Sequence, residues 1–210
     1  MGEARALVIV DYQNIHLTAH EQWAPLGTPK HETLVHPLSF AAAVVRKRQH
    51  IGGALAMAGK TPPPHHTAGL GGVIVYRGCP SNRQDPTAYR RSQAQRSEWT
   101  RDPKVEVVYR TLKYYQSGPP REKGVDVLVA INLVEAVRAA QHDVVILAAH
   151  DTDQEPALEA AVTLAGVTGV AVETAGWEKS KVLKPSGRRL WHTALNGGDF
   201  VKCRDRKDYT

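Results

Sequence analysis

Short apolar runs alternate along the chain with longer segments in which apolar residues recur every three or four positions. The short runs predict buried strands over residues 6–10, 73–77, 105–110, 143–149 and 170–174. The longer segments predict helices over 38–48, 86–100, 124–141 and 155–166. Strands separated by helices require right-handed crossovers, so we expect an α/β fold with a mainly parallel central sheet.

Three segments lack this pattern. A polar, proline-containing stretch separates the first strand from the first predicted helix. Residues 59–72, GKTPPPHHTAGLGG, contain three prolines and are predicted to be a loop. After Trp177 the chain is polar and has no clear period. We therefore divide it into a domain over 1–178 and an ordered C-terminal extension over 179–210 that packs on this domain.

Carboxylates stand where the predicted strands end. The first apolar run leads directly into Asp11, with Asn14 three residues later. The fourth predicted strand is followed by Asp151 and Asp153, and Asp126 lies in the first turn of the third predicted helix. Because ligands of open α/β sheets bind at the carboxyl ends of the strands, we expect these acids to face a common site.

Each acid also has a purely structural explanation. Asp11 can open the turn or cap the next helix. The sequence TDQE over 152–155 forms a capping box, and both Asp126 and Asp153 are favourable near a helix N-terminus. Together, however, acids that converge on one dry edge repel one another unless some are protonated or a divalent cation lies among them. Carboxylate oxygens select a hard cation, so the sequence predicts Mg²⁺ or Mn²⁺.

Positive charge is concentrated in the middle of the chain. The 210 residues carry a net charge of +6, and residues 77–123 contain eleven Lys or Arg against five Asp or Glu. Aromatic residues are interleaved with these cations, a composition typical of surfaces that bind single-stranded nucleic acid. The alternative is a solvated helix whose aromatic side chains pack inward. On the first interpretation, the candidate RNA-binding arginines are Arg90, Arg91 and Arg96.

The composition excludes several other classes of protein. Hydrophobic residues make up 42% of the chain and charged residues 23%, which is ordinary for a globular domain, and no apolar run approaches the roughly 18 residues of a membrane span. The two cysteines form neither a metal spacing nor a disulfide framework, and the N-terminus enters a strand without a secretory signal. We expect a cytoplasmic protein with no membrane partner; self-association into a homo-oligomer is left open.

Three motifs, in order, resemble the NYN domain, a branch of the PIN-like metal-dependent ribonucleases. They are VIVDYQNIH, REKGVDVLVAINLVEAV and DVVILAAHDTDQEPALEAA, and the similarity runs from about residue 6 to residue 177. The resemblance implies a PIN-like three-layer α/β/α sandwich that hydrolyses phosphodiester bonds of RNA, most readily single-stranded RNA, with Mg²⁺ or Mn²⁺.

The resemblance also implies roles for the motif residues. Asp11, Asp126 and Asp151 are the expected metal ligands, and Asp153 completes the set of catalytic acids by binding a second cation or positioning the attacking water. Two further residues are expected to contact substrate or support the ligands. They are Asn14, which follows the first aspartate, and Lys123, which precedes Gly124 and Asp126 in the KGVD motif and would hold a phosphate.

The chain departs from the family pattern at several positions, among them Gln154, where an apolar residue is usual after Asp153. The family often has another aspartate where this chain has Asn132, and a serine with a small residue where Ala149 and His150 stand. His150 either contacts the metal or the substrate, or is held by hydrogen bonds at the strand end. Because the lost hydroxyl and acid weaken the expected metal site, the alternative function is a catalytically weak NYN-fold protein that binds RNA or a regulatory partner.

Overall fold

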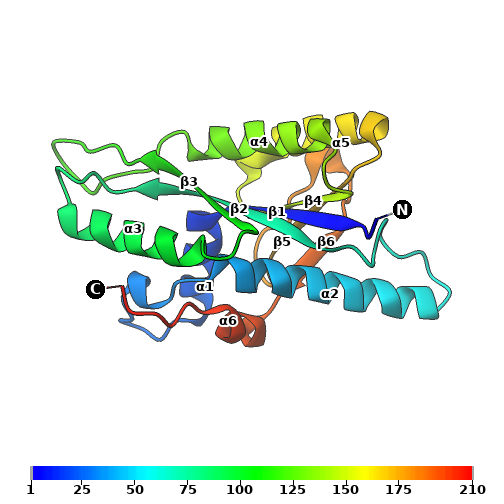
Figure 1. Cartoon of the computed structure of the whole chain (residues 1–210), viewed down its shortest axis with the longest axis horizontal. Coiled ribbons are helices and arrows are strands. Elements are labelled where there is room, and N and C mark those ends of the chain that lie inside the picture. The colour runs from blue at the N-terminus through cyan, green and yellow to red at the C-terminus, as the bar shows by residue number, and fades with distance from the viewer. Residues whose placement is uncertain (1, 210) are drawn as a thin grey trace.

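The computed structural model describes residues 2–209 as one parallel sheet with helices on both faces (Figure 1). The strand order is β3-β2-β1-β4-β5-β6, so the chain starts in the centre of the sheet and extends toward one edge and then the other. The strands are β1 (Arg5–Asp11), β2 (Gly69–Cys79), β3 (Val105–Thr111), β4 (Val144–Ala148), β5 (Ala171–Trp177) and β6 (His192–Leu195).

The helices form two outer layers. In Figure 1, α4 and α5 cover one face of the sheet, and the other four helices lie on the opposite face. The predicted fold class, a three-layer α/β/α sandwich with a mainly parallel sheet, is therefore confirmed. The helices are α1 (Tyr12–Trp23), α2 (Pro37–Met57), α3 (Pro86–Trp99), α4 (Val125–Ala139), α5 (Glu155–Thr168) and α6 (Gly197–Cys203).

Strand β1 is buried on both sides, as its unbroken apolar run predicts. Leu7 and Ile9 belong to the core beneath α4 and α5, whereas Val8 and Val10 belong to the core on the opposite face. Because successive side chains of a strand point to opposite faces, a single short segment fills both layers. The same segment carries Asp11 to the carboxyl edge of the sheet.

Two predicted boundaries were wrong. The end of the predicted loop over 59–72 is already strand, because β2 begins at Gly69 and pairs there with Arg5 of β1. Helix α2 continues to Met57, well past the predicted end at residue 48, and Gly52 lets it approach the following loop: a Cβ at this glycine would lie 2.6 Å from His66 Cβ. The stretch after β1, in which no helix was predicted, forms α1.

The C-terminal extension completes the domain. Residues 192–195 form β6, which pairs in parallel with β5 at the edge of the sheet. Helix α6 follows and packs on α2, with Phe200 in the core beside Trp177 and Trp23. No regular element was predicted after residue 178, yet this part of the chain supplies a strand and a helix. Within residues 2–209, none of the helices is long and apolar enough to cross a lipid bilayer.

A buried ion pair connects the layers. Arg48 of α2 donates to both carboxylate oxygens of Glu173 in β5, at 2.7 Å each, and both side chains are almost fully buried. The same guanidinium donates to the backbone carbonyls of Pro64 and His65. This bidentate pair satisfies a charge that would otherwise be costly to bury, and it ties the loop before β2 to the sheet.

Candidate acidic site

Asp11 lies at the carboxyl end of the central strand. It is the last residue of β1 and the N-cap of α1, where its Oδ1 accepts a hydrogen bond from the backbone N–H of Asn14 at 3.2 Å. Only 4% of the residue is exposed. Asp11 therefore caps α1, as its structural explanation from sequence requires. It can also face a site at the edge of the sheet, since the two roles are compatible.

Asp126 and Asp151 reach the same edge from other elements. Asp126 is the second residue of α4, which begins after Gly124; this N-cap glycine has φ of +77°, a conformation that glycine adopts without strain. Asp151 follows β4, and its Oδ1 accepts a hydrogen bond from the backbone N–H of Asp153 at 3.0 Å. Asp153 itself has an exposed side chain at the first turn after the strand.

The acids meet around one cavity of about 460 Å³, which we call the acidic cavity. Asp11, Asp126 and Asp151 line it, together with Asn14. Asp153 and Lys123 do not line it, although both are neighbours in sequence of residues that do. Three of the four predicted catalytic acids are thus brought together, and the fourth lies outside the cavity wall.

The electrostatics of the cavity are unfavourable for so many anions. The pKa of Asp11 is raised from 3.8 to about 7: burial is the largest cause, the hydrogen bond from Asn14 opposes it, and the negative charges of Glu122, Asp126 and Asp151 add to the rise. Burial also raises the pKa of Asp126, with Asp151 and then Asp153 adding to the effect. Asp11 and Asp126 are therefore harder to ionise in the presence of the neighbouring acids.

Besides Glu21, the cavity is lined by another acid that was not predicted from the sequence, Glu122. Its Oε1 accepts a hydrogen bond from the backbone N–H of Gly78, and the Gln13 amide, with its NH₂ facing the carboxylate, lies 2.7 and 2.9 Å from the two oxygens. Burial raises its pKa, which Gly78 and the charge of Arg77 lower. The sequence feature that could have pointed to Glu122 is its position directly before the KGVD motif.

Asn14 connects two strand ends rather than facing open solvent. Its Oδ1 accepts a hydrogen bond from the backbone N–H of His150 at 2.7 Å. The His150 ring points away from the acids: Nε2 accepts from the backbone N–H of Trp177 at 3.1 Å, and Nδ1 lies 3.0 Å from the carbonyl of Lys181. Nδ1 must then carry the proton and donate it, so His150 is held by hydrogen bonds, the second of its two predicted roles.

The predicted basic residues are distributed over different places. The side chain of Lys123 is exposed, and its carbonyl accepts a hydrogen bond from Arg110 Nε at 2.6 Å. Arg121, which was not predicted, lines the acidic cavity instead. On α3, Arg90 and Arg96 are exposed, whereas Arg91 is half-buried and its Nε is buried without a hydrogen-bond partner among the described residues.

The aromatic residues of the basic segment are mostly structural. Trp99 is buried and donates from Nε1 to Asp205 at 2.7 Å, and Tyr109 donates to the carbonyl of Ser92 at 2.5 Å. The hydroxyl of Tyr114 accepts from the backbone N–H of Ser81. These three rings favour the second interpretation of the segment, inward packing, and leave Tyr115 as an exposed ring.

Asn132 does not belong to the acidic cavity. Its amide donates to the carbonyl of Leu128 one turn earlier in α4, at 2.9 Å, and the residue lines a separate cavity with Leu7 and Lys104. The six-residue separation from Asp126 corresponds to a large rotation around the helix, which accounts for this placement. The asparagine therefore removes no acid from the set that surrounds Asp11.

The donor set suits a hard cation with a partial hydration shell. Within residues 2–209, no three His, Cys, Asp or Glu side chains lie in an arrangement that could share one metal ion. However, the ionisable donors around Asp11 are all carboxylates, and none of the ion pairs between described residues neutralises Asp11, Asp126 or Asp151. Mg²⁺ is commonly held by one or two carboxylates and several waters. The residues fit such a hydrated ion.

Comparisons with known proteins do not add to the evidence for the site. No protein-family model matches the sequence, and no curated protein matches it. Among solved structures, the chain is similar to a protein of unknown function from Vibrio parahaemolyticus, with 17% sequence identity and a TM-score of 0.48 over 97% of this chain and 90% of the other. The resemblance to the NYN domain therefore continues to rest on the three sequence motifs.

Proposed function

We propose that the protein is a metal-dependent ribonuclease that hydrolyses phosphodiester bonds of single-stranded RNA. The observation that carries the proposal is Asp11: a buried carboxylate at the end of the central strand, with Glu122, Asp126 and Asp151 around it and, among the described residues, no ion pair that neutralises it. Carboxylates crowded in this way destabilise the folded protein through mutual repulsion, and a bound divalent cation offsets that repulsion.

The residues divide into two roles. Asp11, Asp126 and Asp151 would hold a hydrated Mg²⁺ or Mn²⁺, with at most two of these carboxylates bound directly and the remainder acting through water. Such an ion would supply an acidified water and screen the charge of the phosphodiester. Glu122, whose pKa is raised by burial, lines the same cavity and orients the attacking water or accepts its proton. Arg121 contributes positive charge on the cavity wall, the part that the sequence analysis gave to Lys123.

A second candidate function is an RNA-binding protein with little or no cleavage. The observation that favours it is the lack, within residues 2–209, of three side chains arranged to share one metal ion. In that case Asp11 needs no cation at or below neutral pH, because its raised pKa, about 7, keeps at least about half of this carboxyl protonated there. The two functions differ in whether a divalent cation binds at micromolar to millimolar concentration.

The test combines cleavage with a metal-binding readout. A labelled single-stranded RNA should be cleaved with Mn²⁺ or Mg²⁺ and left intact in excess EDTA, and Mn²⁺ should raise the melting temperature because it binds only the folded state. The Asp11→Asn, Asp126→Asn double variant, purified in the same way, serves as the control for contaminating ribonuclease and should show neither effect. Full cleavage in EDTA would contradict the metal mechanism. RNA binding without cleavage or thermal shift would favour the second function.

A further inference from the structure

The acidic cavity adjoins a second cavity of opposite charge. This second cavity, of about 310 Å³, shares Gln13, Leu17, Pro120 and Glu122 with the acidic cavity, so the two adjoin. We call it the basic cavity. Its walls come from α1, from the short helix η1 (Lys30–Glu32), from α3 and from the ends of β2 and β3.

Cations predominate in the walls of the basic cavity. Lys30, Arg77 and Arg91 line it, and Glu122, at the junction with the acidic cavity, is the one acid among its described residues. Leu17, Leu112 and Pro120 add an apolar wall on the same side as Glu122. A cavity with apolar and cationic walls suits a nucleotide, whose base and phosphate need these two environments.

Two of the cations differ in how they are held. The Arg77 guanidinium stacks 4.7 Å from the ring centre of Tyr12 and donates to Gln95 Oε1 at 2.9 Å, so its charge is fixed in place. Arg91 is half-buried, and its buried Nε has no hydrogen-bond partner among the described residues. A buried donor left without an acceptor is costly, which a bound anion would relieve.

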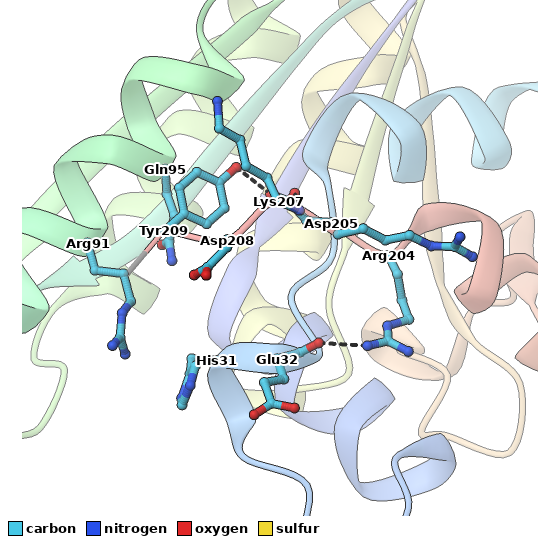
Figure 2. Close-up of a pocket in the computed structure, with 10 residues that line it drawn as sticks. His31, Glu32, Arg91, Gln95, Arg204, Asp205, Lys207, Asp208 and Tyr209 are labelled. Carbon is cyan, nitrogen blue, oxygen red and sulfur yellow. Dashed lines mark hydrogen bonds between the residues drawn. The ribbon is translucent and has the colours of Figure 1, made fainter.

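A third cavity, of about 470 Å³, continues from the basic cavity toward the C-terminus and shares His31, Arg91 and Gln95 with it (Figure 2). Two of its other cations already have partners, since Arg204 donates to the carbonyl of Glu32 and Lys207 donates to Glu98, whereas Arg206 is exposed. Acids line it as well. In Figure 2 the Arg91 side chain extends away from Lys207 and Tyr209. Arg91 lines both cavities, but several acids line the outer one and Glu122 is the one acid among the described residues of the basic cavity, so an anion on Arg91 is better placed in the basic cavity.

We propose that the basic cavity holds the nucleotide next to the cleaved bond, with its phosphate on Arg91 and Lys30 and its base against Leu17, Leu112 and Pro120. The inference rests on the proposed function in taking RNA as the ligand. It goes further by assigning a specific subsite and by separating Arg91 from Arg90 and Arg96, which line none of the three cavities. Arg77 adds a fixed positive field between this subsite and the acids.

The test measures binding without cleavage. A fluorescently labelled single-stranded RNA is titrated in EDTA at several KCl concentrations against the wild-type chain, Arg91→Gln and Lys30→Gln. Each variant should bind about tenfold more weakly, as for one lost hydrogen bond to a charged group, and the log–log salt slope should fall by about 0.7. Arg46→Gln is the matched control: this arginine is exposed on α2 and lines none of the three cavities, so its binding should stay within about twofold.

The side chain of Lys30 is exposed, so Lys30→Gln should fold normally even where Arg91→Gln is destabilised. Equal losses of RNA affinity in the two variants and in Arg46→Gln would mean that RNA is attracted by the overall positive charge. That result would overturn the subsite. Wild-type affinity in both variants, or no RNA binding by the wild-type chain, would overturn it too. If the wild-type chain binds RNA through these residues but cleaves none with Mn²⁺, the proposed nuclease function fails and the subsite stands.

Discussion

Asn14 and His150 are joined by a hydrogen bond of 2.7 Å between the Asn14 side-chain oxygen and the His150 backbone N–H. The backbone N–H of the same Asn14 donates to Asp11, and His150 directly precedes Asp151. Asn14 thus fixes the ends of β1 and β4 relative to each other. It thereby also fixes Asp11 and Asp151, two of the acids that surround the acidic cavity. In this arrangement Asn14 positions two acids of the cavity and need not contact the substrate itself.

Replacing this amide should cost both stability and activity. Asn14→Ala leaves the His150 N–H without its acceptor, a loss of about 1–3 kcal/mol, which lowers the melting temperature by roughly 3–8 °C. RNA cleavage should fall more than tenfold, because Asp11 and Asp151 lose their shared anchor. Asn132→Ala is the control, since that amide donates only within its own helix. Lost cleavage at an unchanged melting temperature would instead indicate direct contact with substrate, the other of the two roles that the sequence leaves open for Asn14.

The regular elements that could be predicted are those with a strong period and a buried face. Strand β1 and helix α4 are examples, because each has a continuous apolar run or stripe that the core requires. Helix α1 was missed because its buried positions include Tyr12 and His16, which do not register as apolar. Strand β6 has four residues at the edge of the sheet, too few for alternation to be recognised.

The site could be predicted only where a motif fixes the backbone. Asp11 and Asp151 follow strands directly, so the carboxyl-end rule locates them. The position of Glu122 depends on the loop between β3 and α4, which returns to the sheet through an isolated bridge between Lys113 and Arg121. The role of Arg91 depends on the packing of α3 against the C-terminal segment. Neither arrangement produces a periodic pattern of apolar and polar residues that could be recognised in the sequence.

Asp11→Asn should stabilise the protein at neutral and alkaline pH. The folded-state pKa of Asp11, about 7, lies above the unfolded value near 3.8, so this group's contribution to stability is present below about pH 4 and is lost as pH rises to 7. Asparagine keeps the helix cap and carries no charge. In EDTA, the melting temperatures should coincide near pH 4, and the variant should exceed wild type by roughly 5–10 °C at pH 8. A gain of equal size at both pH values would contradict this explanation.

Asp126→Asn separates catalysis from stability. The substitution keeps the shape of the side chain and removes a charge that burial and Asp151 already disfavour. Cleavage of single-stranded RNA should fall by at least about a hundredfold, while the melting temperature should hold or rise. Glu135→Gln on the same helix is the control, because that exposed acid pairs with Arg138 away from the cavity. If Asp126→Asn cleaves RNA as well as Glu135→Gln does, Asp126 is only a helix-terminal residue.

Glu122 should prove as important as the acids of the motifs. Glu122→Gln keeps an acceptor for the Gly78 N–H but removes the charge, so cleavage should fall at least about tenfold with the fold intact. Gly78→Ala tests the position of the carboxylate by another route, because the new Cβ would lie 2.2 Å from Leu112 Cδ2 and 2.7 Å from Glu122 Cγ and must displace one of them.

Gly72→Ala is the matched control on the same strand, where the nearest atom to a Cβ would be Leu7 Cδ1, at an ordinary 3.4 Å. Initial cleavage rates and melting temperatures of the three variants should be measured side by side. Gly78→Ala should lose activity together with Glu122→Gln, whereas Gly72→Ala should keep both activity and stability. Wild-type cleavage by Glu122→Gln would remove Glu122 from the site. It would also leave its bond to Gly78 as a structural contact at the rim of the acidic cavity.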